Sequence, residues 1–168
     1  MDPHDVIVIG GGAGGAAAAI RAAQLGAKVA VVEDKFLGGL CMNRGCVPFG
    51  HMLTAAHILG GLTLGKDMGI ECSGVTINFD TLMKRQNELV TFMRQGVQGL
   101  FNKHRIALIK GIGRLAGSGK VEVGSKTLSA AKIILASGSQ WLKPGIQGSD
   151  CPGVVNSDHL LTANALPQ

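Results

Sequence analysis

Two cysteines in the segment 38–48, Cys41 and Cys46, have the residue type and the spacing for redox chemistry. In a regular α-helix this separation corresponds to about 7.5 Å of axial rise, with the side chains on different faces. A disulfide requires Cα atoms roughly 4.4–6.8 Å apart, so the backbone between the cysteines must be irregular or tightly wound. Asn43 and Gly45 favour such a backbone. The pair therefore predicts a disulfide that forms and breaks easily, with two ordinary buried thiols as the alternative.

The residues after the cysteines predict a helix that begins near Cys46. Pro48 suits the first helical turn, and the partial positive charge of a helix N-terminus favours a thiolate at Cys46. The chain then stays apolar, and the glycine pair 60–61 is expected to weaken or end the helix. His51 and His57 are six positions apart, so they do not share a helix face as paired metal ligands would. We therefore predict no metal site.

A glycine-rich turn near the N-terminus predicts a nucleotide-binding site. The apolar run 6–9 is typical of a strand buried on both faces, and Gly10, Gly12 and Gly15 follow it with the spacing of the dinucleotide fingerprint. In that motif the first glycine turns the chain, the second lets the backbone approach a pyrophosphate, and the third lets helix and strand pack closely. Glu33 ends a second predicted strand, where it can accept a hydrogen bond from a ribose hydroxyl.

The remaining periodic segments predict the elements that position these residues. Asp80 is expected to cap an amphipathic helix that ends near residue 103 and whose apolar stripe faces the core. Ser137 and Gly138 follow a predicted strand, at the edge where open α/β sheets bind ligands. The order of elements predicts an α/β fold, namely a Rossmann-like parallel sheet with a small antiparallel insertion around 120–128. The elements are a helix over 16–25 and strands over 28–33, 106–110, 120–123, 126–128 and 131–136.

Composition and charge exclude several classes of function. The net charge of +5 comes from scattered lysines and arginines without interleaved aromatic residues, so we predict a phosphate-bearing ligand and no nucleic-acid partner. The segment 6–20 is read as the longest uncharged apolar stretch and is too short to span a bilayer, so no membrane partner is predicted. The acidic flank 1–5 argues against a secretory signal, and a cytoplasmic protein is expected. Cys72 and Cys151 are expected not to pair with the other two cysteines.

Taken together, these motifs resemble the N-terminal FAD-binding domain of the pyridine nucleotide–disulfide oxidoreductases, of the dihydrolipoamide dehydrogenase or mercuric reductase type. The glycine fingerprint with Glu33, the cysteine pair followed by Pro48, the long helix after Asp80 and the strand that leads into the segment 136–138 carry the resemblance. It covers nearly the whole chain, and the motifs are specific in combination. The fold that the resemblance implies is the same Rossmann-like domain that the order of elements predicts.

The resemblance also implies roles for individual residues. In the family the second cysteine of the pair faces the flavin as a charge-transfer thiolate, which would be Cys46. The first is the interchange thiol that attacks the substrate disulfide, which would be Cys41. FAD is the implied cofactor, and its implied contacts are Gly10, Gly12, Ala13, Gly14, Gly15, Glu33, Asp34, Gly39, Leu40, Cys41, Gly113, Ala136, Ser137 and Gly138.

The chain departs from the family pattern near the cysteines and in length. Phe49-Gly50 stands where the family usually has Ser-Lys, so a cation close to the flavin is missing, and Leu40 replaces a usual threonine. Family members continue into a fold for NAD(P) and a dimerisation domain with a His–Glu acid–base pair. We therefore divide the chain into an FAD-binding domain over 1–150 and a tail over 151–168 that leads to the missing NAD(P) domain.

These departures set the expected activity. The resemblance implies a homodimeric enzyme that acts on a small-molecule or lipoyl disulfide, and the 168 residues alone are expected to be poorly active. A non-catalytic module that holds FAD or another nucleotide is the main alternative, and a mercuric reductase-like flavin domain is a further one. A metal-binding module that uses the cysteines is weaker, because no other ligands have suitable spacing.

Overall fold

A six-stranded, mostly parallel sheet forms the centre of the fold, with the strand order β3-β2-β1-β6-β5-β4. The computed structural model describes residues 3–166. Its strands are β1 (His4–Ile9), β2 (Val29–Glu33), β3 (Ala107–Lys110), β4 (Gly113–Leu115), β5 (Lys120–Val123) and β6 (Lys126–Leu135). Parallel pairs join β1 to β2, β1 to β6 and β2 to β3, whereas β4, β5 and the start of β6 form an antiparallel meander. The predicted parallel sheet with a small antiparallel insertion is confirmed.

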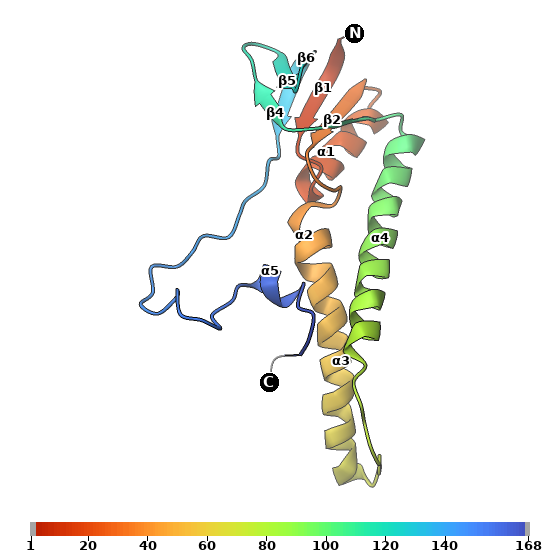
Figure 1. Cartoon of the computed structure of the whole chain (residues 1–168). Helices are drawn as coiled ribbons and strands as arrows, with labels where there is room; N and C mark the ends of the chain where they lie inside the picture. The colour runs from red at the N-terminus through yellow and green to blue at the C-terminus, as the bar shows by residue number, and fades with distance from the viewer. Residues whose placement is uncertain (1–2, 167–168) are drawn as a thin grey trace.

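The helices lie beside the sheet and in a long projection away from it (Figure 1). They are α1 (Ala13–Gln24), α2 (Gly39–Arg44), α3 (Cys46–Gly65), the short 3-10 helix η1 (Lys66–Met68), α4 (Phe79–Lys103) and α5 (Ser157–Leu160). The helices α3 and α4 run side by side as a hairpin that projects away from the sheet (Figure 1). The segment 136–156 has no helix or strand and leads from β6 to α5, which lies beside the hairpin (Figure 1).

The two faces of the parallel sheet bury different partners. One face packs against α1 and the end of α4, through Val8, Ala16, Ala19, Val29, Val31, Leu37, Phe101 and Ile106. The other face packs against the meander, through Ile7, Ile9, Ala30, Val32, Val121, Val123, Leu128 and Ala130. The residues of β1 and β2 are therefore buried on both faces of the sheet, as in parallel α/β sheets. The glycine turn and Glu33 directly follow these two strands.

The last strand, β6, corrects the prediction of two separate strands over 126–128 and 131–136. It is continuous: its first part pairs antiparallel with β5, and its second part pairs parallel with β1. The apolar run 131–136 also predicts a buried strand, which is wrong at its end, where Ile134 and Leu135 are 37% and 63% exposed. The reason is that α1 packs on β1 and β2 rather than on β6.

The ends of the two long helices also differ from their predicted positions. Asn78, not Asp80, caps α4, because the Asn78 side chain accepts a hydrogen bond from the Thr81 N–H at 2.9 Å. Asp80 lies in the first turn, where a negative charge interacts favourably with the helix dipole. The glycine pair 60–61 does not end α3, which continues to Gly65. Packing of α3 along α4 outweighs the helix-propensity cost of about 1 kcal/mol for each glycine.

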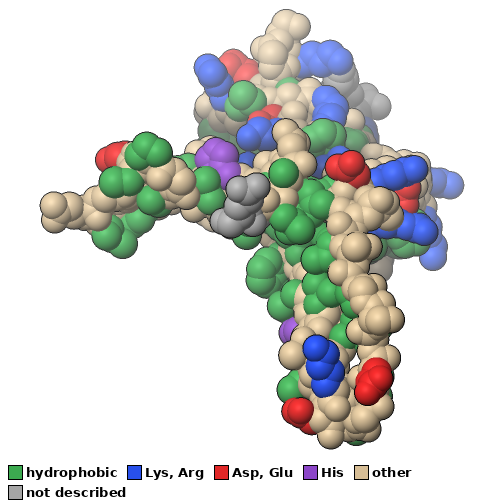
Figure 2. Space-filling view, turned by 60° about the horizontal axis from the view of Figure 1, so that its bottom comes forward, with side chains coloured by type: hydrophobic (Ala, Val, Ile, Leu, Met, Phe, Trp, Pro, Cys, Tyr) green, Lys and Arg blue, Asp and Glu red, His purple; other side chains and the backbone are tan. Residues whose placement is uncertain are grey.

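Apolar side chains gather along the α3–α4 hairpin (Figure 2). The stripe of α4 that was predicted to face the core is mostly exposed: Phe92 is 68% exposed, whereas Val90 and Phe101 are buried. The physical reason is that the hairpin projects beyond the sheet, so only the end of α4 nearest the sheet joins the core.

One segment, Gly39–Met68, is long and apolar enough to cross a membrane by length and composition alone, and little of it is buried. The interpretation of 6–20 as the longest uncharged apolar stretch is therefore wrong, because 45–65 also contains no Asp, Glu, Lys or Arg. Core helices of proteins without a membrane segment pass the same test, so length and composition do not decide the matter. The absence of a membrane partner stays a prediction.

The end of α4 is closed by a residue in the left-handed conformation. Arg105 has a φ of 55°, and its N–H donates to the Asn102 carbonyl at 3.1 Å. The Ile106 N–H donates to the Phe101 carbonyl at 2.9 Å, which completes a Schellman cap. Phe101 and Ile106 are both buried and belong to the same cluster, which gives the hydrophobic contact that accompanies this cap.

We predict that Arg105→Gly stabilises the protein, although it removes a side chain. A non-glycine residue in the left-handed region costs about 1 kcal/mol, and glycine removes most of that cost, so the free energy of unfolding should rise by about 0.5–1 kcal/mol. Urea unfolding followed by circular dichroism measures the change. The control is Lys103→Gly, inside the last turn of α4, which should lower stability by about 1 kcal/mol. Destabilisation by Arg105→Gly would contradict the cap.

Candidate functional site

The glycine turn between β1 and α1 is packed too tightly to hold side chains at two positions. Gly10 has a φ of +105°, and a Cβ there would lie 2.1 Å from the Ala136 carbonyl oxygen. A Cβ at Gly15 would lie 1.9 Å from the Gly10 carbonyl oxygen. Gly12 is the N-cap of α1, with no side-chain cap and no acidic residue in the first turn. The first N–H groups of α1 therefore remain available to an anion, as in phosphate-binding turns.

Glu33 links the end of β2 to the glycine turn. Its side chain is only 9% exposed, and Oε2 accepts a hydrogen bond from the Gly11 N–H at 2.7 Å. The other oxygen, Oε1, accepts from the Lys35 N–H at 2.8 Å. Each carboxylate oxygen keeps further acceptor capacity, so Glu33 can hold the turn and still accept from a ribose hydroxyl. The sequence predicts the ribose contact of Glu33 but not its hydrogen bond with the Gly11 N–H.

Two further segments reach the same edge of the sheet. The Ala136 N–H donates to the Ile9 carbonyl at 2.8 Å, which places Ser137 and Gly138 just beyond the glycine turn. A Cβ at Gly113 would lie 3.2 Å from Ile9 Cγ2, so this residue packs over the end of β1. The carboxyl ends of parallel strands are where open α/β sheets bind ligands.

The loop that leads into α2 packs directly on the glycine turn. The Gly38 N–H donates to the Gly11 carbonyl at 2.8 Å, and a Cβ at Gly39 would lie 2.7 Å from the Gly12 Cα atom. Gly38 and Gly39 have φ values of 92° and 60°, which favour glycine. The two backbones touch because neither carries a side chain at the contact. Cys41 follows this contact within one helical turn.

The helical path is interrupted between the two cysteines. The helix α2 ends at Arg44, Gly45 has a φ of −143° and a ψ of −120°, and α3 begins at Cys46. The Cys46 side chain lies close enough to Cys41 to shift its pKa, and all four cysteines of the chain carry free, exposed thiols. The backbone break expected at Gly45 and the helix start expected at Cys46 are confirmed. Asn43 does not contribute to the break, because it lies inside α2.

The contact between the two sulfurs changes the acidity of Cys41. The hydrogen bond with the Cys46 side chain raises the pKa of the Cys41 thiol, and desolvation and the nearby Cys46 charge act in the same direction. The Cys46 backbone N–H donates to the Cys41 sulfur and partly opposes the rise in pKa. The neutral form of Cys41 is therefore favoured while Cys46 lies beside it.

We predict that Cys41 reacts with iodoacetamide only at raised pH and that Cys46→Ala lowers the pH at which it does so. A raised pKa means less thiolate at a given pH, and the thiolate is the reacting species. Without the Cys46 side chain, the two largest Cys46 effects disappear and the reaction midpoint should move to lower pH. Mass spectrometry of the Cys41 peptide over a pH series measures the midpoint. Cys151→Ala is the control and should leave it unchanged; an unchanged midpoint in Cys46→Ala would refute the coupling.

Comparison with known proteins assigns this arrangement to a family. The family model for pyridine nucleotide-disulphide oxidoreductases matches residues 4–167. The chain belongs to this family. The resemblance found from the glycine turn and the cysteine pair is thereby confirmed.

Two relatives and one solved structure show how the chain relates to this oxidoreductase family. Dihydrolipoyl dehydrogenase 3 of Pseudomonas putida is 44% identical over 177 residues, which cover 100% of this chain and 38% of the relative. The mitochondrial dihydrolipoyl dehydrogenase of Dictyostelium discoideum is 36% identical over 174 residues, which cover 99% of this chain and 36% of the relative. The Cu(II) complex of an HOCl-induced flavoprotein disulfide reductase from Escherichia coli matches with a TM-score of 0.77 and 26% identity, covering 97% of this chain and 34% of that one. The chain therefore spans little more than a third of the length of these proteins.

Most residues predicted to contact FAD lie around one edge of the oxidoreductase domain. The turn, the strand ends and the loop before α2 bring together Gly10, Gly12, Ala13, Gly14, Gly15, Glu33, Gly39, Gly113 and Ala136. Asp34, Leu40, Cys41, Ser137 and Gly138 border the same edge as exposed residues. Their contacts with a cofactor stay predictions.

Sequence reasoning missed several residues that shape this edge. Gly11 binds both Glu33 and Gly38, and the glycine run was the signal that could have identified it. Asn43 was noted only for its backbone, although its side chain bonds to the loop before α2. No local signal indicated Arg94, which reaches Asn43 from a distance of 51 positions along the chain.

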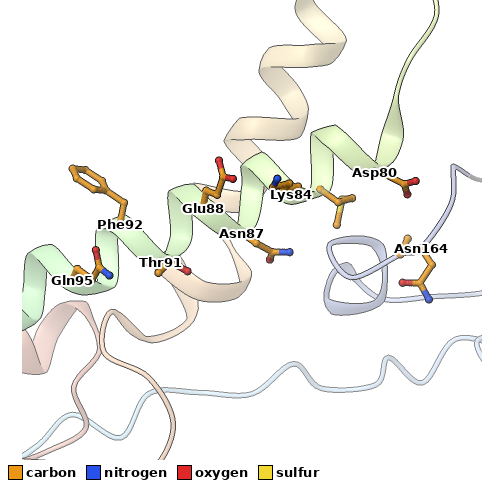
Figure 3. A pocket seen from close by; sticks show the side chains of 10 residues that line it. Asp80, Lys84, Asn87, Glu88, Thr91, Phe92, Gln95 and Asn164 are labelled. Atoms are coloured by element: carbon orange, nitrogen blue, oxygen red, sulfur yellow. The ribbon is translucent and has the colours of Figure 1, made fainter.

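A separate hollow of 730 Å³ lies between α4 and the C-terminal segment (Figure 3). Its lining includes Asp80, Lys84 and Glu88 on α4 and Asn164 on the C-terminal segment (Figure 3). None of the residues predicted to contact FAD or to react with a disulfide lines it. We therefore assign it no role in the oxidoreductase site.

Proposed function

We propose that this chain is the flavin domain of a disulfide oxidoreductase of the dihydrolipoyl dehydrogenase type. In this proposal, Cys41 and Cys46 pass electrons between FAD and a small-molecule or lipoyl disulfide. The observation that carries it is the pair of exposed free thiols at the junction of α2 and α3, held beside a dinucleotide-type turn by the Gly38 and Gly39 contacts. The closeness of Cys46 to Cys41 would allow a disulfide, and the exposure of both thiols allows a substrate to reach them. We also propose a cytoplasmic location, because free thiols persist in a reducing compartment.

The residues present fit FAD at three points. The uncapped N-terminus of α1 at Gly12 would face the pyrophosphate. Glu33 is buried at the end of β2, where its spare acceptor capacity would meet the adenosine ribose. Contact between the backbones of Gly12 and Gly39 would bring the thiol-bearing helix α2 beside the same cofactor. When bound, FAD supplies a two-electron carrier next to the cysteine pair.

The thiol chemistry belongs to the chain's own side chains. The Cys41 thiolate attacks one sulfur of the substrate disulfide, so a mixed disulfide forms and the first substrate sulfur leaves as a thiol after taking a proton. The Cys46 thiolate then attacks the Cys41 sulfur, which releases the second substrate thiol and leaves a Cys41–Cys46 disulfide. Two electrons and two protons pass from the cysteines to the substrate. Cys46 is the first residue of α3, so both reacting sulfurs lie at the junction of α2 and α3.

Titration with FAD tests the cofactor assignment. We expect the chain to bind FAD and Glu33→Gln to weaken binding by about 1–3 kcal/mol, because the ribose loses a charge-assisted hydrogen bond. Flavin fluorescence measures the dissociation constant. The control is Glu71→Gln, an exposed position in the loop before α4, which should bind FAD as the native chain does. Unchanged affinity in Glu33→Gln would count against Glu33 as the ribose contact.

The visible spectrum of the FAD-loaded chain distinguishes the proposed activity from a module that only holds a nucleotide. Mild dithiol treatment should change the flavin spectrum if the reduced cysteine pair lies against the flavin. The same treatment of Cys46→Ala should leave the spectrum unchanged. A native spectrum that does not respond to the dithiol would favour the non-catalytic module.

A further inference from the structure

The Arg94 side chain joins the long helix α4 to the helix that carries Cys41. Arg94 of α4 is half-buried, and its Nε donates a hydrogen bond to Asn43 Oδ1 on α2. Its guanidinium carbon lies 3.9 Å from the centroid of the Phe36 ring, in the loop before α2. Hydrogen bonding and cation–π stacking together fix the direction of this side chain. Arg94 therefore contacts both the cysteine helix and the loop that enters it.

The Asn43 side chain also bonds to the backbone at the start of α2. Its Nδ2 donates to the Leu37 carbonyl at 2.9 Å and to the Gly39 carbonyl at 2.7 Å. An asparagine amide has one donor end and one acceptor end, and only the acceptor end can bond to Arg94. Arg94 thereby selects the amide orientation in which Nδ2 faces the two carbonyls.

The two carbonyls belong to the segment that connects both halves of the candidate site. Gly38, between Leu37 and Gly39, donates to the glycine turn at Gly11. Cys41 lies two positions after Gly39 and two before Asn43, inside the stretch that the amide holds. A shift of α2 would therefore separate the Cys41 and Cys46 sulfurs and weaken the contact between Gly38 and the glycine turn.

We propose that Arg94 is a positioning residue that acts through Asn43 to hold Cys41 against Cys46 in the geometry from which their disulfide closes. The proposal rests on the proposed function of the cysteine pair. Arg94 touches neither sulfur, so its contribution is to the alignment of the two thiols. The expected measure of that contribution is the rate of ring closure from a mixed disulfide.

The test uses glutathione and needs no flavin. One oxidised glutathione and two protein thiols give one protein disulfide and two glutathione thiols, and the closing step is attack by one cysteine on the mixed disulfide of the other. Rapid acid quenching and mass spectrometry follow the mixed disulfide and the closed form. Cys72 and Cys151 are replaced by serine in every protein, so that only the pair reacts.

Three variants distinguish the proposed role from general packing. Arg94→Met keeps the length of the side chain but loses the donor, and closure should slow by about tenfold, since small misalignments of reacting groups cost that much or more. Arg94→Lys keeps a cationic donor and should recover most of the rate. Arg85→Met is the matched control, because Arg85 lies on the same helix, is exposed, and pairs with Glu88 of that helix; its rate should equal that of the native chain.

The variant Asn43→Asp tests whether Arg94 acts on the cysteine pair through Asn43 or directly. Aspartate keeps an acceptor for Arg94 but cannot donate to the Leu37 and Gly39 carbonyls, so closure should slow as in Arg94→Met. The double variant Arg94→Met/Asn43→Asp should close no more slowly than the slower single variant, because both substitutions interrupt the same series of contacts.

Equal closure rates in Arg94→Met and Arg85→Met, or additive losses in the double variant, would overturn the proposal. Failure of Arg94→Lys to recover the rate would also contradict the hydrogen-bond basis. A native pair that never closes would instead refute the proposed function itself, so the two failures are distinguishable.

Discussion

Gly15→Ala is expected to destabilise the protein severely. A Cβ at this position would lie 1.9 Å from the Gly10 carbonyl oxygen and 3.2 Å from the Ala136 Cβ atom. Both neighbours belong to the packed junction of β1, α1 and β6, so the overlap cannot be relieved by turning a flexible side chain. We expect a loss of about 3 kcal/mol or more of unfolding free energy, at the upper end of overpacking effects. Thermal unfolding without FAD should then begin about 6–12 °C lower.

Gly14→Ala provides a control at the neighbouring position. A Cβ at Gly14 would meet no atom within 4 Å, although the residue lies in the same turn of α1. Alanine is a better helix former than glycine by about 1 kcal/mol, so Gly14→Ala should be neutral or slightly stabilising. Equal stability of the two variants would show that the close approach of helix and strand is not what requires glycine at position 15.

Loss of either cysteine of the pair is expected to abolish the redox reaction. In the native chain, oxidised glutathione should convert two thiols into one internal disulfide, because the Cys46 side chain lies close enough to Cys41 to raise its pKa. Cys41→Ala or Cys46→Ala should leave only mixed disulfides, which dithiothreitol releases. Closure within one chain has an effective concentration that exchange between molecules cannot match, so internal disulfide formation should fall by at least about 100-fold.

The remaining cysteines supply the matched controls for this experiment. Cys72 and Cys151 are also exposed and free, and they lie in the loop before α4 and in the segment before α5. Cys72→Ala and Cys151→Ala should each still form the internal disulfide on oxidation. An internal disulfide that involves Cys46 in Cys41→Ala, located by peptide mapping, would contradict the assigned pair.

The parts of the site that could be predicted from sequence depend on short-range constraints. The run of apolar residues before Gly10, the spacing to Gly15 and the distance to Glu33 each reflect local geometry of a strand, a turn and a helix. The break at Gly45 and the helix start at Cys46 are also local, because a glycine and a proline within three residues restrict the backbone. These constraints led to the family, which the family model then confirmed.

The sequence by itself determined the fold class, the glycine turn and the cysteine pair, because backbone preference and hydrophobic period act over a few residues. Only the tertiary structure decided that β6 is one strand, since its two halves are stabilised by different neighbours, β5 and β1. It likewise decided that Glu33 bonds to Gly11 and that Arg94 reaches Asn43, contacts between residues 22 and 51 positions apart. Such contacts depend on how whole elements pack, and no local pattern of residues encodes that packing.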